Sequence, residues 1–392
     1  MRKLIWILLA ALVLTGCSTE APSPYVTQPA ESLPAVSAAM EETAPVADPL
    51  DLLLAALSTE EKVGQLFLAA PEQLLPNAGA LTAMSAPLGE ALCRYPVGGI
   101  ILFADNILSP AQLEAFNQEL SLACSIGPFL AVDEEGGTVA RLGKNSAFEL
   151  PRYASAAAVA APGDPSDALE MGRTIGEYLK RYEFNLDFAP VADVNTNPAN
   201  PIIGKRAFSS DPEVAAQMAA AFTAGLNEYG IIGCYKHFPG HGDTAQDSHS
   251  GLAITYRTRE EMESCEWIPF REAGSADFVM VGHIAAPEIT GDMTPATLSY
   301  RMVTEILKGD LGFSGLVITD AMNMGAITRD YPAGEAAVAA LQAGCDVILM
   351  PEDLPKAFEA VLTALDSGRL TMEWLDETVR RILEFKELYG IL

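Results

Sequence analysis

GLVITD (residues 315–320) and DVILMP (residues 346–351) are two short apolar runs near the carboxyl end that decide the fold class. Both are almost continuously apolar rather than alternating, which is typical of parallel strands covered on both faces. Six further runs of this kind precede them: GQLFLAA (64–70), GGIILF (98–103), FLAVD (129–133), LDFAP (186–190), IIGCYK (231–236) and FVMVGHI (278–284). The sequence therefore predicts eight short buried strands.

Longer amphipathic stretches separate these runs and predict helices, among them residues 110–123, 211–230, 259–274 and 371–390. Ser58 and Glu61 are spaced as a capping box that begins another helix. Eight strands each followed by a helix indicate an α/β protein built as a single TIM-like (β/α)₈ barrel, with its functional residues at the carboxyl ends of the strands. An open doubly wound sheet is the alternative, but it does not usually need eight such units.

The first 17 residues, MRKLIWILLAALVLTGC, have the pattern of a secretory signal: two basic residues, an apolar run from Leu4 to Leu14, and small residues before Cys17. The ending LTGC (14–17) resembles a bacterial lipobox, which implies a lipid on Cys17 that anchors the protein to a membrane. An ordinary signal peptide, or an uncleaved anchor with a chance cysteine, is the alternative.

Residues 18–50 contain six prolines and no basic residue, so we expect a solvated tether rather than a core. Fully extended, this tether would span about 100 Å. The predicted organisation is a signal peptide (1–17), a tether (18–50) and one barrel domain (51–392), with no second domain after the last helix. The expected location is extracytoplasmic, on a membrane-anchored lipoprotein.

The charge balance excludes one class of partner. The chain has 52 Asp and Glu against 24 Lys and Arg, a formal net charge of −28. A surface of this sign repels phosphate backbones, so we expect no nucleic acid partner. Membrane contact should then come from the lipid on Cys17 alone.

Polar residues gather where the barrel would place a site. Asp133, Lys236, His237, His283 and Asp320 all lie in or directly after predicted strands. The segment KHFPGHGDTAQDSH (236–249) holds three of the four histidines of the chain. A helical metal site is disfavoured because Pro-Gly follows the first histidine and no HExxH glutamate is present. We expect no metal and no organic cofactor.

Asp247 and His249 stand two residues apart in this segment. The carboxylate can accept a hydrogen bond from one imidazole nitrogen while the other nitrogen faces a substrate, which is an acid–base dyad. A turn capped by the aspartate is the structural alternative.

The segment KHFPGHGDTAQDSH resembles the signature of the β-N-acetylglucosaminidase branch of glycoside hydrolase family 3. Similar family segments occur in the same order across the barrel: VGGIILF (97–103), AVDEEGG (131–137), FAPVADV (188–194), GKRAF (204–208), PATLS (295–299) and LGFSGLVITDAMNM (311–324). Together they cover nearly all of residues 51–392. Ala207 stands where family members often carry serine, and the neighbouring arginine is kept.

The resemblance implies a role for each matching residue. Asp320 falls on the catalytic nucleophile, and His249 falls on the general acid/base with Asp247 as its orienting partner. A capping role at a strand–helix junction is the structural alternative for Asp320. The residues that match sugar-hydroxyl ligands are Asp133, Arg141, Arg206, Lys236 and His237, with His283 and Asp193 as second-rank candidates that could be structural.

The function that the resemblance implies is a retaining exo-β-N-acetylglucosaminidase that hydrolyses terminal β-linked GlcNAc through a covalent glycosyl-Asp intermediate. The tether and the compartment suggest peptidoglycan fragments as the substrate, although chitin oligosaccharides fit the same chemistry. A GlcNAc phosphorylase, a broad β-glucosidase of the same family, and a non-catalytic wall-binding lipoprotein are the alternatives. A monomer is expected.

Overall fold

The computed structural model describes residues 48–245, 251–274 and 277–392, which belong to one compact unit. Eight parallel strands form its central sheet: β1 (Phe67–Ala69), β2 (Gly99–Ile101), β3 (Phe129–Val132), β6 (Leu186–Asp187), β7 (Ile232–Phe238), β9 (Phe278–Val281), β11 (Leu316–Thr319) and β12 (Ile348–Leu349). Each lies within one of the eight runs predicted as strands, except that β7 continues two residues further.

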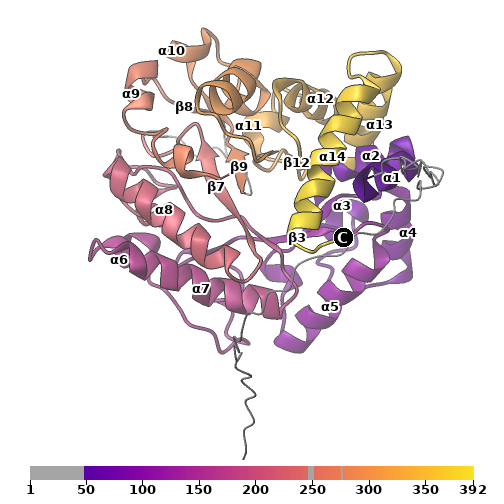
Figure 1. Ribbon diagram of the computed structural model, residues 1–392, viewed down its shortest axis with the longest axis horizontal. Coiled ribbons are helices and arrows are strands. Elements are labelled where there is room, and N and C mark those ends of the chain that lie inside the picture. Colours follow the sequence, from indigo (N-terminus) through magenta and orange to yellow (C-terminus); the bar gives the residue numbers. More distant parts are fainter. Residues whose placement is uncertain (1–47, 246–250, 275–276) are drawn as a thin grey trace, which may run out of the picture. The chain divides into compact units, whose positions relative to one another are not determined.

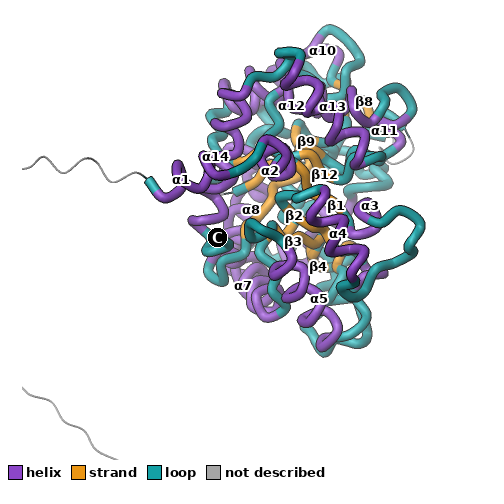
Figure 2. Tube along the Cα trace, turned by 90° about the vertical axis from the view of Figure 1, so that its right-hand side faces the viewer, coloured by secondary structure: helices purple, strands orange, loops and turns teal. Residues whose placement is uncertain are grey.

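The strand order follows the chain from β1 to β11, and β12 lies beside β1. The sheet closes between β11 and β12, where Ile318 pairs with Val347 and the Thr319 N–H donates to the Val347 carbonyl at 3.0 Å. Helices surround the strands (Figure 1), and the strands run through the middle of the unit when it is turned by 90° (Figure 2). The predicted (β/α)₈ barrel is confirmed.

The helices of this layer have the following bounds: α1 (Pro49–Ala56), α2 (Thr59–Gln65), α3 (Pro71–Leu74), α4 (Ala86–Arg94), α5 (Pro110–Ala123), α6 (Ala156–Ala160), α7 (Pro165–Arg181), α8 (Pro212–Asn227), α9 (Arg259–Glu263), α10 (Pro287–Thr290), α11 (Gly325–Thr328), α12 (Ala333–Ala343), α13 (Leu354–Asp366) and α14 (Met372–Leu388). Tighter or wider helical turns are η1 (Ala104–Asn106), η2 (Gly204–Arg206), η3 (Pro269–Glu272), η4 (Ala296–Leu298) and the π-type helix η5 (Arg301–Asp310). Four short strands lie outside the barrel sheet: β4 (Glu134–Gly136), β5 (Val139–Ala140), β8 (Ala253–Ile254) and β10 (Ile284–Ala285).

Helix starts follow the capping rules. Ser109, Asp164 and Asp211 each accept a backbone N–H at the start of α5, α7 and α8, and a proline occupies the first turn of each helix. The predicted capping box before α2 is present in full, with the Ser58 and Glu61 side chains each accepting the other's backbone N–H. Helix α1 begins at Pro49, inside the stretch that the sequence assigned to the tether.

The helix predicted over residues 259–274 is wrong in its length. The chain forms only α9 (Arg259–Glu263) and then the separate turn η3 (Pro269–Glu272). Pro269 has no N–H to give to a continuing helix, and the Trp267 N–H reaches back to the Met262 carbonyl instead of the carbonyl of residue 263. After this break Glu266 and Trp267 are fully buried.

One large apolar cluster makes up most of the core, and every residue of β1, β2, β3, β7, β9 and β11 is buried. Aromatic rings fill its amino-terminal end: the rings of Phe129 and Phe278 meet edge to face at 5.3 Å, and Phe385 of α14 packs on Phe278 at 5.7 Å. Lys386 is fully buried beside them, with its ammonium 5.0 Å from the Phe129 ring centre. None of the helices in the described ranges is long and apolar enough to cross a membrane.

Candidate active site

A cavity of ≈ 320 Å³ opens at the carboxyl ends of the barrel strands. Its lining combines charged side chains with an apolar wall: Ile101, Phe103, Asp133, Glu135, Val139, Arg141, Phe188, Ile202, Arg206, Lys236, His237, His241, Met280, Asp320, Ala321, Asn323, Met324, Leu349 and Met350. Six of the residues predicted from the sequence lie in this lining: Asp133, Arg141, Arg206, Lys236, His237 and Asp320. The structure therefore brings together side chains from the ends of β3, β7 and β11, from the turn after β5 and from η2, and these are up to 187 positions apart in the chain.

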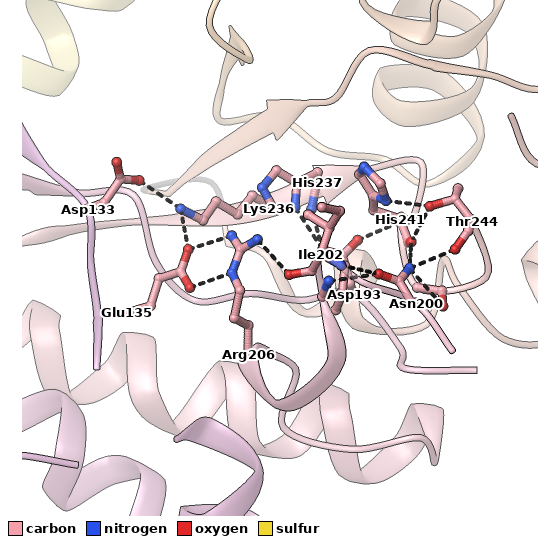
Figure 3. Close-up of polar contacts among 12 residues, drawn as sticks. Asp133, Glu135, Asp193, Asn200, Ile202, Arg206, Lys236, His237, His241 and Thr244 are labelled. Carbon is pink, nitrogen blue, oxygen red and sulfur yellow. Dashed lines mark hydrogen bonds and ion pairs between the residues drawn. The ribbon is translucent and has the colours of Figure 1, made fainter. Parts of the chain in front are cut away.

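A chain of opposite charges crosses the floor of the cavity (Figure 3). The Lys236 ammonium lies 2.9 Å from Asp133 Oδ1 and 2.8 Å from Glu135 Oε1. Arg206 forms a bidentate ion pair with Glu135, in which Nε lies 2.8 Å from Oε2 and Nη2 lies 2.7 Å from Oε1. Such bidentate, charge-assisted hydrogen bonds fix both partners in orientation. The result is an ordered row of donors and acceptors in the cavity lining.

These contacts keep every member of the row charged. Burial alone raises the pKa of Glu135, but the Lys236 and Arg206 charges outweigh it and lower that pKa to about 2. Burial also raises the pKa of Asp133. The Lys236 and Arg141 charges outweigh burial, so that this pKa is below its usual value. Burial lowers the pKa of Lys236, but the Asp133 and Glu135 carboxylates outweigh burial and raise this pKa above its usual value. Charged groups that are already paired and oriented can strengthen hydrogen bonds to neutral hydroxyls.

Arg141 enters the cavity from the turn after β5. Its Nη2 donates to Asp133 Oδ2 at 3.1 Å, and its guanidinium lies 5.4 Å from the Phe103 ring centre. The buried Glu134 carboxylate accepts the N–H groups of Leu142 and Gly143 at 2.8 and 2.9 Å. Glu134 therefore holds the backbone directly after Arg141 and sets the position of the guanidinium.

Asp320 is the first residue after β11, and its backbone N–H donates to the Val281 carbonyl of β9 at 2.9 Å. Its Oδ1 accepts the Ala321 N–H at 2.7 Å. Burial raises the pKa of this carboxyl, but the nearby His283 and His237 charges outweigh burial and leave the pKa below its usual value. Asp320 is thus an ionised carboxylate in the wall of the cavity, as a carboxylate nucleophile requires.

His283 lies behind the cavity rather than in its lining. Its ring is fully buried, with Nδ1 2.8 Å from Thr297 Oγ1 and Nε2 3.0 Å from the Ala321 carbonyl. It contacts the backbone next to Asp320 through the Ala321 carbonyl, where it can support that carboxylate.

The second-rank candidate Asp193 organises the turn after β7. One of its oxygens lies 2.7 Å from His237 Nδ1, and the other accepts the His241 N–H at 2.6 Å. Asn200 secures the same turn by donating to the His241 and Thr244 carbonyls at 2.7 and 3.0 Å (Figure 3). Asp193 therefore sets the imidazole of His237 in the cavity wall.

The predicted dyad, Asp247 and His249, lies outside the described residues, which stop at 245 and resume at 251. Among the residues that are described, no group of three or more His, Cys, Asp or Glu side chains could hold a metal ion.

The sequence interpretation missed Glu135 and the apolar wall. Glu135 follows Glu134 directly, and only strand alternation separates their roles, because adjacent side chains point to opposite faces. The wall includes Phe103, Met324 and Met350, and Met350 has a positive φ of 47° that is unusual for a residue with a side chain. The one available signal was that Asp133 and Glu135 share a face at a spacing of two.

Comparison with known proteins gives this site a family. Residues 58–385 match the model of the glycosyl hydrolase family 3 N-terminal domain, and residues 1–18 match that of the prokaryotic membrane lipoprotein lipid attachment site. The chain is 32% identical over 334 residues to a β-hexosaminidase A from Pseudoalteromonas piscicida, covering 78% of this chain and 56% of that protein. The chain belongs to glycosyl hydrolase family 3.

Two solved structures show the same likeness. A family 3 β-N-acetylglucosaminidase from Paenibacillus sp. str. FPU-7 superposes with a TM-score of 0.79 at 36% identity, covering 86% of this chain and 63% of that one. A β-glucoside phosphorylase superposes with a TM-score of 0.74 at 27% identity, covering 87% of this chain and 60% of that one. The chain thus spans about three fifths of the length of these relatives. The predicted family and the predicted lipoprotein attachment site are both confirmed.

Proposed function

We propose that this protein is a retaining exo-β-N-acetylglucosaminidase. The observation that carries the proposal is the ionised Asp320 carboxylate in the wall of a cavity whose floor is the ordered row from Asp133 to Arg206. The names of the similar proteins, a β-hexosaminidase and a β-N-acetylglucosaminidase, support the choice of sugar.

In the proposed first step Asp320 attacks the anomeric carbon of a terminal GlcNAc while His249 protonates the departing oxygen. A covalent glycosyl-Asp320 ester forms and the aglycone leaves as an alcohol. In the second step His249, now a base, takes a proton from water, which attacks the same carbon and releases Asp320. Asp247 orients His249 and stabilises its charged form. No metal or organic cofactor takes part.

The sugar is held by the charged residues on the floor of the cavity. Asp133, Arg141, Arg206, Lys236 and His237 provide the donors and acceptors for its hydroxyls, and His283 acts from behind through the backbone at Asp320. A pocket built on charged hydrogen bonds rejects sugars that lack the matching hydroxyl, because its own polar groups would lose their partners.

The proposed setting follows from the lipid attachment site. A lipid on Cys17, a tether over residues 18–50 and a barrel over residues 51–392 would present the site outside the cytoplasm at a membrane surface. Peptidoglycan fragments with a terminal GlcNAc are the substrate that this location favours, and we expect a monomer.

A phosphorylase is the second candidate, favoured by the structural likeness to a β-glucoside phosphorylase. Phosphate would then replace water in the second step. Turnover of 4-nitrophenyl β-N-acetylglucosaminide and 4-nitrophenyl β-glucoside, each with and without phosphate, separates the options. Hydrolysis confined to the N-acetyl sugar and indifferent to phosphate supports the proposal. Formation of sugar 1-phosphate favours the phosphorylase, and no turnover of either glycoside by the folded protein favours a wall-binding lipoprotein.

A further inference from the structure

A buried carboxylate that the mechanism does not use lies beneath the turn after β7. Glu266, in the break between α9 and η3, is fully buried. Its Oε1 lies 3.1 Å from Arg257 Nε and accepts the Thr196 hydroxyl at 3.4 Å, while its Oε2 has no hydrogen-bond partner within the described ranges. Burying a carboxylate costs free energy even when one cation pairs with it, so its position calls for a reason beyond packing.

Asp243 shares the same guanidinium. Its Oδ2 accepts the Thr255 hydroxyl at 2.6 Å and lies 3.7 Å from Arg257 Nε. Two carboxylates thus face one arginine.

The stem of Glu266 also packs on the turn at Gly240. A Cβ added to Gly240, whose φ is +128°, would lie 2.7 Å from Glu266 Cβ and Cγ. Only glycine fits there, so Glu266 and the turn are in direct contact.

These contacts lie on both sides of one stretch of sequence. Gly240 and Asp243 come before residues 246–250, and Thr255 and Arg257 come after them. We propose that Glu266, acting through Arg257 and Asp243, is a positioning residue for the segment that carries the acid/base, because it fixes the two flanks of that segment to the barrel. This inference rests on the proposed function, since the acid/base role belongs to His249.

The charges at the cluster agree with this geometry. Burial raises the pKa of Glu266 to about 7, the Arg257 charge opposes that shift, and the Asp243 carboxylate adds to it. Burial also raises the pKa of Asp243, which Arg257 and His241 oppose. One cation shared by two carboxylates makes each contact depend on the other.

The test uses the full chain with Glu266→Gln, which keeps the shape of the side chain, and Glu266→Ala, which removes the carboxylate and the Cγ atom that packs on Gly240. Glu263→Gln is the matched control, because Glu263 pairs with Arg259 at 2.6 Å on the half-exposed surface of α9. We compare kcat and KM on aryl β-N-acetylglucosaminides whose leaving groups range from dinitrophenol, which needs no proton, to phenol and a second GlcNAc, which need one.

The expected result is a loss of kcat/KM, which reports the first step, that grows as the leaving group becomes poorer. For Glu266→Gln we expect the loss of kcat/KM to be about tenfold on the disaccharide and under about twofold on the dinitrophenyl glycoside, a fraction of the roughly 10²–10⁴-fold that a general acid contributes. Glu263→Gln should match the unaltered protein. Equal losses on all leaving groups, or no loss in either Glu266 variant, would overturn the inference.

Two further readouts separate this inference from the proposed function. If His249→Ala shows the leaving-group dependence and the Glu266 variants do not, the function stands and the inference fails. If the unaltered protein turns over none of these glycosides, the proposed function fails, and hydrogen exchange decides the positioning claim. Glu266→Ala should then accelerate exchange about tenfold or more at the amides of residues 240–245 and 251–257 relative to those of α8. Unchanged exchange there would overturn the inference.

Discussion

The buried Lys386 makes the free energy of unfolding depend on pH by an amount that follows directly from the structure. Its ammonium donates to Gln65 Oε1 at 2.7 Å and to the Gly98 carbonyl at 2.9 Å, in the aromatic amino-terminal end of the barrel. Burial disfavours the charged form and lowers the pKa of Lys386 from the ordinary 10.5 to about 7. Among the described residues, no carboxylate lies within hydrogen-bond distance of Lys386 to stabilise its charged form.

The sign of the pH dependence follows from linkage. Between pH 7 and 10.5 the unfolded chain binds a proton at Lys386 that the folded chain has lost, so the free energy of unfolding rises with pH. With these two pKa values the rise between pH 7 and pH 9 amounts to about 2 kcal/mol. Lys386→Met removes this titration but leaves two buried acceptors without their donor, at a cost of about 1–3 kcal/mol each. The slope with pH, rather than the stability at one pH, is therefore the test.

Urea denaturation at pH 7, 8 and 9 measures that slope for the unaltered protein and for Lys386→Met. We expect the advantage of the unaltered protein over the variant to grow by about 2 kcal/mol across this range. Lys180→Met, which removes an exposed lysine of α7, is the control and should show no such change. A difference between Lys386→Met and the unaltered protein that stays constant from pH 7 to 9 would refute the reasoning.

The remaining predictions concern the site. Asp320→Asn should abolish turnover of every glycoside, because an amide cannot form the glycosyl ester, and initial rates near those of the unaltered protein would contradict the nucleophile role. His249→Ala should lose about 10²–10⁴-fold on natural leaving groups and much less on dinitrophenyl glycosides, and a uniform loss would count against an acid/base. Lys236→Met leaves Glu135 and Asp133 with one cation fewer and should raise KM while costing roughly 3–5 kcal/mol of stability, both measurable by kinetics and urea denaturation.

The barrel could be predicted from the sequence because its strands are short apolar runs ended by polar residues. GLVITD and IIGCYK contain β11 and most of β7, and the helix starts at Ser58 and Pro110 follow local capping rules. The helix over residues 259–274 could not be predicted correctly, because its interruption depends on the burial of Glu266 and Trp267. The helix propensity of this stretch is overridden by the burial of its side chains in the folded protein.

The charged residues of the site could be predicted from the sequence, whereas most of their hydrogen-bond partners could not. Asp133, Lys236 and Asp320 stand at strand ends, which the barrel brings together whatever the loops do. Glu134 and Glu135 are equivalent in sequence, and only the pleat turns one toward the Leu142 and Gly143 amides and the other toward Lys236. The partner of His283 could not be read from the sequence either, because Thr297, whose hydroxyl lies 2.8 Å from its Nδ1, comes 14 residues later.

Trapping the covalent intermediate tests the central claim most directly. A GlcNAc-configured glycosyl fluoride with a second, ring-bound fluorine should react quickly in the first step and slowly in the second, so that the ester accumulates. Peptide mass spectrometry of the full chain should then find one added sugar on the peptide that contains Asp320, and none in Asp320→Asn. A label on a different residue, or steady release of fluoride with no label on any peptide, would contradict the account.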